Sequence, residues 1–395
     1  MRHGRVVTAV MLWLAMMPVA FTAQLDGALD AIVTGEQYLN VSVVPMYQNA
    51  LRSGADTGNY TADAIGKFTV RAAGQDSSLG NTDLVFWLNS SSTLGDLQSA
   101  SKMAAEAGLL WDTNDIGTDS SNTSFLVLGI DQWLRDESVS VGLGKMFPGQ
   151  MVLSSPYTAD NSNMFTSKMI TGNPVVSWWE ALGIGANLGI FGKRWFVQFA
   201  FVDSKAEGDL DFSSFFDGKF TYLGEATWQP DNANGETSIG LVGYYTEARN
   251  RRTSESGVVG QFTHEWGADA HYAAFGRYSI RDGGESEDPA NPVSEEPVKH
   301  GGFFGFAWNR PFGRHDDLLA AAAMYGEPTD SKKAQGFDSQ YGIEVFWSLR
   351  ATPWLKVLPN VQVIRNRWDD VETVVGIRIN AGFQRTWQAR SIYDL

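Results

Sequence analysis

The alternation of side chains near the C-terminus restricts the possible folds of this chain most strongly. Along residues 341–349 and 371–383 one parity is predominantly apolar, whereas the other carries Glu344, Glu372 and Arg378. Successive side chains of a β-strand point to opposite faces, so each segment predicts a strand with one apolar face. A tilted membrane-spanning strand needs about 9–11 residues. Two neighbouring strands of this length favour a transmembrane barrel over a soluble sandwich.

The N-terminus indicates export from the cytoplasm. Arg2 and Arg5 precede an apolar run, and small residues follow at Ala20 and Ala23. This order predicts a signal peptide over residues 1–23. No later run is long and apolar enough to predict a spanning helix. The mature protein is therefore expected to be soluble outside the cytoplasm or inserted in a membrane as a barrel.

Composition excludes several classes of function. The chain has no cysteine, which rules out thiolate metal sites and cysteine nucleophiles. Its formal net charge of −15 argues against nucleic acid as a partner, because a phosphate backbone attracts a basic surface. The 14 tryptophans suggest aromatic belts at membrane interfaces or aromatic binding surfaces.

Alternating segments recur along the whole chain and predict about sixteen strands, an even number as in bacterial outer-membrane barrels. The predicted strands are 37–49, 64–74, 82–90, 124–134, 139–147, 180–191, 193–203, 219–228, 236–248, 256–266, 269–281, 299–310, 316–326, 339–349, 354–365 and 372–383. We therefore expect an all-β fold, a transmembrane antiparallel β-barrel. It would occupy residues 37–383, between a periplasmic lead-in (24–36) and a C-terminal extension (384–395).

The links between these strands sort by length. Counted back from Phe383, every second link is short or moderate, for example 135–138 and 350–353. The others are mostly long and polar, such as 91–123 and 148–179. Short periplasmic turns with long extracellular loops are typical of outer-membrane barrels, and a sandwich has no reason to sort loops by parity.

Three features predict local departures from this simple pattern. Lys145 shares the parity of the apolar residues before it, so its strand is expected to bulge or to end there. Pro359 removes a backbone donor from the strand that contains it. The long loop 91–123 has apolar residues at helical spacing, from Leu94 to Trp111. This helix either folds inward and narrows the pore or forms an external cap.

At the C-terminus the sequence resembles the carbohydrate-selective porin family (OprB type) of Gram-negative outer membranes. The resemblance is carried by Glu344, Leu358-Pro359, Gln362 and the run from Val374 to Arg378. It continues more loosely through Gln132-Trp133-Leu134 and Gly144-Lys145. The chain departs from the family where Arg365-Asn366-Arg367 replaces the usual Asn-Pro turn, and where it continues beyond Phe383.

The resemblance implies a barrel in the Gram-negative outer membrane that passes sugars by diffusion through a narrow, partly charged and aromatic channel. Its partners would be permeating sugars, outer-membrane lipid and lipopolysaccharide, and it would be a monomer or a homotrimer. The residues themselves leave alternatives open. These are a general diffusion porin, an outer-membrane barrel enzyme and a soluble sugar-binding β protein.

Side chains on the lumen parity supply the chemistry that a sugar needs, because hydroxyls require polar partners and C–H faces require aromatic ones. An alternative role for any one charged residue is to pair across strands and stiffen the wall. The predicted pore-lining residues are Arg277, Arg281, Arg378, Glu344, Glu372, Phe275 and Phe346.

Catalysis, cofactor binding and metal binding have little support in the sequence. His264 and His271 flank a tight turn, but no motif places a serine or an aspartate to complete a triad. The glycine-rich run 183–189 lies within a predicted strand with no helix after it, so it is not a phosphate-binding loop. The acidic run 285–296 does not have calcium-loop spacing. We therefore expect no enzyme activity and no cofactor.

Overall fold

The computed structural model describes most of the chain from Gln37 to Trp387. The described residues are 37–52, 58–73, 80–93, 98–115, 122–134, 137–153, 155–158, 164–177, 183–205, 214–230, 236–249, 251–286 and 296–387. The predicted signal peptide (1–23) and lead-in (24–36) lie outside these residues, as does the tail from residue 388.

Sixteen antiparallel strands form one closed barrel in which each strand pairs with its neighbours in sequence. Every predicted strand is present. The strands are β1 (Gln37–Ala50), β2 (Gly58–Ala73), β3 (Asn81–Thr93), β4 (Asn122–Leu134), β5 (Val139–Met146), β6 (Gly183–Phe191), β7 (Trp195–Asp203), β8 (Phe220–Trp228), β9 (Thr237–Thr246), β10 (Glu255–Trp266), β11 (Tyr272–Gly283), β12 (Val298–Asn309), β13 (Leu318–Pro328), β14 (Gln340–Thr352), β15 (Leu355–Arg365) and β16 (Val371–Trp387).

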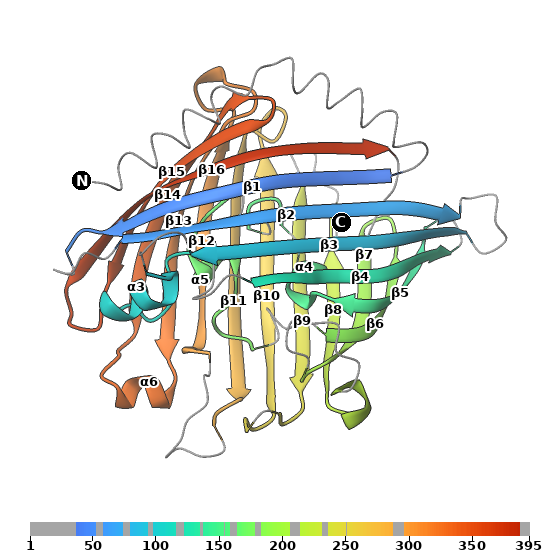
Figure 1. Cartoon of the computed structure of the whole chain (residues 1–395), viewed down its shortest axis with the longest axis horizontal. Coiled ribbons are helices and arrows are strands. Elements are labelled where there is room, and N and C mark those ends of the chain that lie inside the picture. The colour runs from blue at the N-terminus through green and yellow to red at the C-terminus, as the bar shows by residue number, and fades with distance from the viewer. Residues whose placement is uncertain are drawn as a thin grey trace.

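The first and last strands close the barrel. Figure 1 shows β1, in blue, beside β16, in red, and their register runs from Gln37 opposite Trp387 to Ala50 opposite Val374. Closure leaves no sheet edge, so the backbone groups of the wall find partners without water. β16 extends through Trp387. Residues 384–387 of the predicted extension therefore continue the last strand.

The two faces of the wall differ as the alternation predicts. On β14, Glu344 and Phe346 are 0% and 1% exposed, whereas Ile343 is 52% exposed. The same contrast recurs on most of the other strands, where the exposed parity is rich in Val, Ile, Leu, Phe and Tyr. A continuous apolar exterior of this size is unfavourable in water and suits a lipid environment.

Pro359 is accommodated by an interruption in one ladder only. The β14–β15 ladder has no pairs between Phe346↔Asn360 and Leu349↔Val357, while the ladder from β15 to β16 continues through Pro359↔Ile377. This is the result expected from a residue that lacks a backbone donor.

Lys145 differs from its prediction. β5 continues through Lys145, and its register with β4 and β6 has no shift. The change of parity occurs at Gly144, whose φ is +135°, a conformation that favours glycine. A Cβ on Gly144 would lie 2.3 Å from the carbonyl oxygen of Leu128. Lys145 is thereby directed inward and is 2% exposed.

The helices are short and belong to the links. They are α3 (Ala100–Glu106), α4 (Pro148–Met151), α5 (Lys168–Thr171), α6 (Asp330–Ala334), η1 (Ser214–Asp217) and η2 (Pro311–Gly313). Within the described ranges, none of the helices has the length and apolar character needed to cross a membrane.

Two long links fold into the barrel and fill much of its lumen. We call residues 98–115 inner segment 1, and residues 147–153, 155–158 and 164–177 inner segment 2. Their apolar side chains, including Trp111 and Phe165, join those of the wall in one buried cluster. The predicted helix of the 91–123 loop is present as α3, and the chain that follows it contacts the inner wall. The loop therefore folds inward and does not form an external cap.

Candidate functional site: an anchored constriction in the lumen

Glu344 on β14 is the central contact between the wall and inner segment 2. Its carboxylate accepts hydrogen bonds from the backbone N–H of Thr166 at 2.8 Å and of Ser167 at 2.9 Å. It also accepts one from the Thr166 hydroxyl at 2.9 Å and one from the Asn360 amide at 3.3 Å. A fully buried carboxylate with this many donors fixes the position of the backbone that supplies them.

The Thr166 hydroxyl connects both inner segments to β15. It accepts hydrogen bonds from the side-chain amides of Asn360 at 2.8 Å and Gln362 at 2.7 Å. The Gln362 amide also donates to the carbonyl of Thr113 in inner segment 1, at 2.7 Å. The two segments bond directly as well, because the Asp115 N–H donates to the Thr166 carbonyl at 3.1 Å.

Arg378 on β16 lies inward and is 0% exposed. Its guanidinium donates to the carbonyls of Met164 and Phe165 in inner segment 2. The Phe165 ring packs between Phe346, with ring centroids 4.6 Å apart, and Phe275, at 5.8 Å. Phe275 and Phe346 lie on the same face as charged residues because they pack against Phe165, an apolar side chain of inner segment 2.

Arg277 on β11 holds the end of α5. Its guanidinium donates to the Gly172 carbonyl at 2.8 Å and to the Gln261 side chain at 3.0 Å. A longer contact of 3.5 Å reaches the Ile170 carbonyl. Carbonyls that would otherwise be buried without donors are thereby satisfied.

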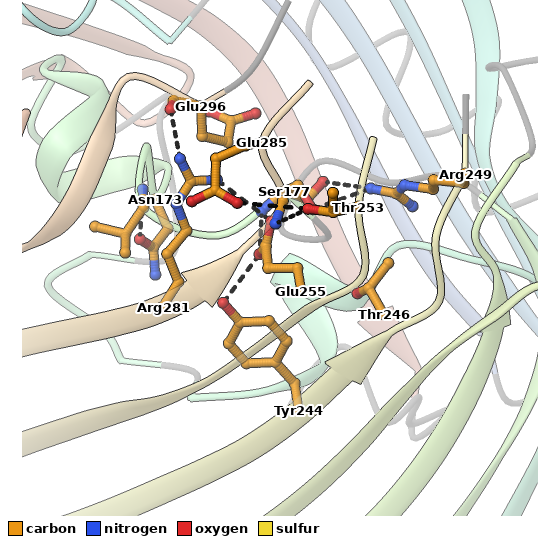
Figure 2. Close-up of polar contacts among 12 residues, drawn as sticks. Asn173, Ser177, Tyr244, Thr246, Arg249, Thr253, Glu255, Arg281, Glu285 and Glu296 are labelled. Atoms are coloured by element: carbon orange, nitrogen blue, oxygen red, sulfur yellow. Dashed lines mark hydrogen bonds and ion pairs between the residues drawn. The ribbon is translucent and has the colours of Figure 1, made fainter. Parts of the chain in front are cut away.

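Arg281 takes part in a cluster at the rim of the long loops (Figure 2). It forms an ion pair with Glu255 at 3.3 Å, and both side chains are at most 2% exposed. The Glu255 carboxylate also accepts from the Tyr244 hydroxyl at 2.9 Å and from the Ser177 N–H at 3.1 Å. The end of inner segment 2 is thus fixed to β9, β10 and β11.

Arg249 reaches the same end of inner segment 2 from the link after β9. Its guanidinium donates to the Ser177 hydroxyl at 3.1 Å and to the Ser204 carbonyl at 2.6 Å. Burial, followed by the nearby Arg252, lowers the pKa of this guanidinium. Ser177 is consequently held from two sides (Figure 2).

Glu372 lies apart from these groups. It is buried at the start of β16, and its carboxylate accepts the backbone N–H of Arg52 at 2.9 Å. The structure therefore brings Glu344, Arg378, Phe275 and Phe346 together around inner segment 2. Arg277 contacts inner segment 2 further along its sequence, and Arg281 pairs with Glu255, which contacts the end of that segment. Glu372 lies beside the link between β1 and β2.

Several anchors were absent from the predicted set. Glu225 on β8 accepts the Leu153 N–H at 3.1 Å, and Gln261 donates to the Leu153 carbonyl at 2.6 Å. In inner segment 2, Tyr157 donates to Glu265 at 2.7 Å; burial and this contact raise the pKa of Tyr157. Glu225 has the same sequence signal as Glu344, an isolated charge on the lumen parity of a strand.

Inner segment 1 is held by neutral amides. Gln340 accepts the Leu110 N–H at 2.6 Å and donates to the Gly108 carbonyl at 3.0 Å. Gln48 exchanges two hydrogen bonds of 3.0 Å with Thr113. Together the two segments, bonded to the wall and to one another, occupy part of the lumen.

One family model matches the C-terminal part of the chain. Residues 246–383 match the family model described as carbohydrate-selective porin, OprB family. The resemblance seen in the sequence is confirmed. A comparison with curated protein sequences found no match.

Solved structures confirm the fold. The chain is similar to the high-pH structure of Pseudomonas putida OprB, with a TM-score of 0.71 and 15% identity over 92% of this chain and 96% of that one. The low-pH structure of the same protein gives 0.60, with 13% identity over 93% and 98%. An anion-selective porin from Comamonas acidovorans gives 0.55, with 12% identity over 89% and 99%.

Proposed function

We propose that this protein is an outer-membrane porin that passes small sugars by passive diffusion through a constriction built by its two inner segments. The family match and the porin fold support a sugar-selective channel in a Gram-negative outer membrane. The observation that carries the mechanism is the position of Thr166, which bonds to Glu344, Asn360, Gln362 and inner segment 1 at once.

The predicted pore residues would act in two ways in this proposal. Glu344, Arg378, Arg277 and Arg281 are buried against inner segment 2 and set the shape of the opening by fixing its backbone. A rigid opening distinguishes solutes by size and by the polar groups they present, as selectivity in channels generally requires. These residues therefore act on sugars mainly through the segment they hold.

β2 and β3 also place charged and aromatic side chains on the lumen wall. The Lys67 ammonium lies 3.7 Å from the ring centroid of Trp87, and Arg71 pairs with Asp83 at 2.9 Å. Cationic, anionic and aromatic groups on this part of the wall can replace the water lost by hydroxyls and cover the C–H faces of a sugar.

The cellular setting follows from the same proposal. Cleavage of residues 1–23 would release the mature chain into the periplasm, from which it inserts in the outer membrane. Outer-membrane lipid and lipopolysaccharide would then contact the apolar exterior. Such a channel needs no catalytic residue, because diffusion down a gradient supplies the driving force.

Sugar block of ion conductance in planar bilayers tests this function. We expect small, steady conductance steps that fall as glucose or maltose is added, because a sugar within the constriction displaces the conducting solution. Conductance that follows only the bulk viscosity of the solution would indicate a general diffusion porin. A detergent-purified chain without heat-modifiable gel mobility would contradict the barrel in a membrane.

A further inference from the structure

A recess lies below the constriction, at the end of the lumen that carries the short links. Met151 and Leu153 of inner segment 2 cover it, and its walls come from the ends of β6 to β10. Phe191 ends β6, and Phe196 follows the short link at the start of β7. The recess therefore lies where a solute leaves the constriction towards the short-link side.

Aromatic rings line one side of this exit. The Phe191 ring lies 5.4 Å from Trp133 and 5.8 Å from Phe196, with interplanar angles of 38° and 32°. All three residues have the lumen parity of their strands, and both phenylalanines are half-buried. Among the described residues, the buried Trp133 Nε1 has no hydrogen-bond partner. Phe191 and Phe196 present flat apolar faces to the recess, and Trp133 supports Phe191 from outside its lining.

Polar side chains on β7, β8 and β9 line the rest of the recess, and Thr227 is the cross-strand neighbour of Phe196. Glu225 is held by Gln198 at 2.9 Å and by Thr227 at 2.9 Å, so this wall is organised before any solute arrives. Gln229 and Ser238 border the recess at the ends of β8 and β9. Amides, hydroxyls and a carboxylate beside aromatic rings suit a ligand that has hydroxyls on its edge and apolar C–H groups on its face.

Gly240 allows Leu153 of inner segment 2 to pack closely against the wall of the recess. A Cβ at this position would lie 2.6 Å from Leu153 Cδ2 and 2.8 Å from Thr227 Oγ1. A side chain at this position would collide with the segment that covers the recess and with its polar wall.

We propose that this recess is an exit subsite for a pyranose sugar, which stacks on Phe191 and Phe196 while its hydroxyls meet the Gln229, Ser238 and Thr227 side. The proposal rests on the proposed sugar-porin function and adds a second site to it, separate from the constriction. A weak site at the exit binds the solute without trapping it.

The test compares sugar block from the two sides of a bilayer containing channels of known orientation. The variants are Phe191→Leu, Phe196→Leu and the double variant, which keep apolar volume and remove the flat rings. Phe199→Leu on β7 is the matched control, because Phe199 is 56% exposed on the outer face of the same strand. The probes are glucose, and mannitol as an acyclic polyol without a ring face.

We expect the double variant to raise the half-blocking glucose concentration from the short-link side by about fivefold. This corresponds to about 1 kcal/mol of stacking energy. Mannitol block, sugar-free conductance and the Phe199→Leu control should remain at wild-type values. Unchanged glucose block in the double variant, or equal loss for glucose and mannitol, would overturn the exit subsite. A wild-type channel that no sugar blocks would instead contradict the porin function itself.

Discussion

The two inner segments enter the same lumen but are held by different chemistry. Inner segment 2 is fixed by buried charges, above all Glu344, Arg378 and the Glu255–Arg281 pair. Inner segment 1 is fixed by the neutral amides of Gln48, Gln340 and Gln362. Hydrogen bonds to charged groups contribute about 1.5–3 kcal/mol each, about twice the contribution of neutral ones. Segment 2 should therefore be the rigid part of the constriction and segment 1 the more easily displaced part.

Removal of Glu344 should have the largest effect. Glu344→Ala removes three short hydrogen bonds and leaves the N–H groups of Thr166 and Ser167 without an acceptor. We expect a loss of about 5 kcal/mol in unfolding free energy and a conductance increase of about twofold or more. Unfolding in detergent and single-channel recordings measure the two effects. Glu344→Gln, which keeps an acceptor, should lie between this variant and wild type.

Breaking the Glu255–Arg281 ion pair at the rim should have the next largest effect. Either Arg281→Ala or Glu255→Ala leaves a buried charge alone, which costs about 3 kcal/mol or more. The double variant should cost less than the sum of the two single variants, because neither charge then remains unpaired. A double-variant cycle of unfolding free energies measures this coupling. Strict additivity would show that the two charges do not stabilise one another.

Removal of a neutral side chain that holds inner segment 1 should have a smaller effect on stability and conductance. Gln340→Ala removes one acceptor and one donor and leaves the Leu110 N–H unpaired, while the Gly108 carbonyl keeps the Arg367 N–H at 2.8 Å. We expect a cost of about 2 kcal/mol and a conductance increase smaller than that of Glu344→Ala. If single-channel recordings showed the opposite order, segment 1 would be the principal barrier.

A substitution on the outer face of β14, the strand that carries Glu344, should have almost no effect. Ile343→Ala changes a side chain that is 52% exposed beside Glu344. Lipid is as apolar as the protein interior, so we expect a change below about 1 kcal/mol and wild-type conductance. Recordings of this variant in parallel with Glu344→Ala separate a specific effect from general damage to β14. An altered conductance here would weaken the assignment of the two faces.

The alternation of side chains predicted the barrel, its sixteen strands and the face on which Glu344 and Arg378 lie. These are local properties, because parity within a strand is set by backbone geometry. The partners of those side chains were not predictable. Glu344 meets Thr166, which is 178 residues away in sequence, and no periodicity shows where a loop folds back. Glu225 was not among the predicted pore residues, although its position on β8 resembles that of Glu344 on β14 and the alternation places it on the lumen face in the same way.

Liposome swelling tests the central claim most directly. Vesicles containing the wild-type protein, and vesicles containing Glu344→Ala, would be exposed to glucose and to a neutral non-sugar solute of similar size. The account predicts faster swelling with glucose in the wild type and a ratio of rates closer to one in the variant, because the opening is then less well defined. Equal rates for the two solutes in the wild type would contradict a sugar-selective constriction.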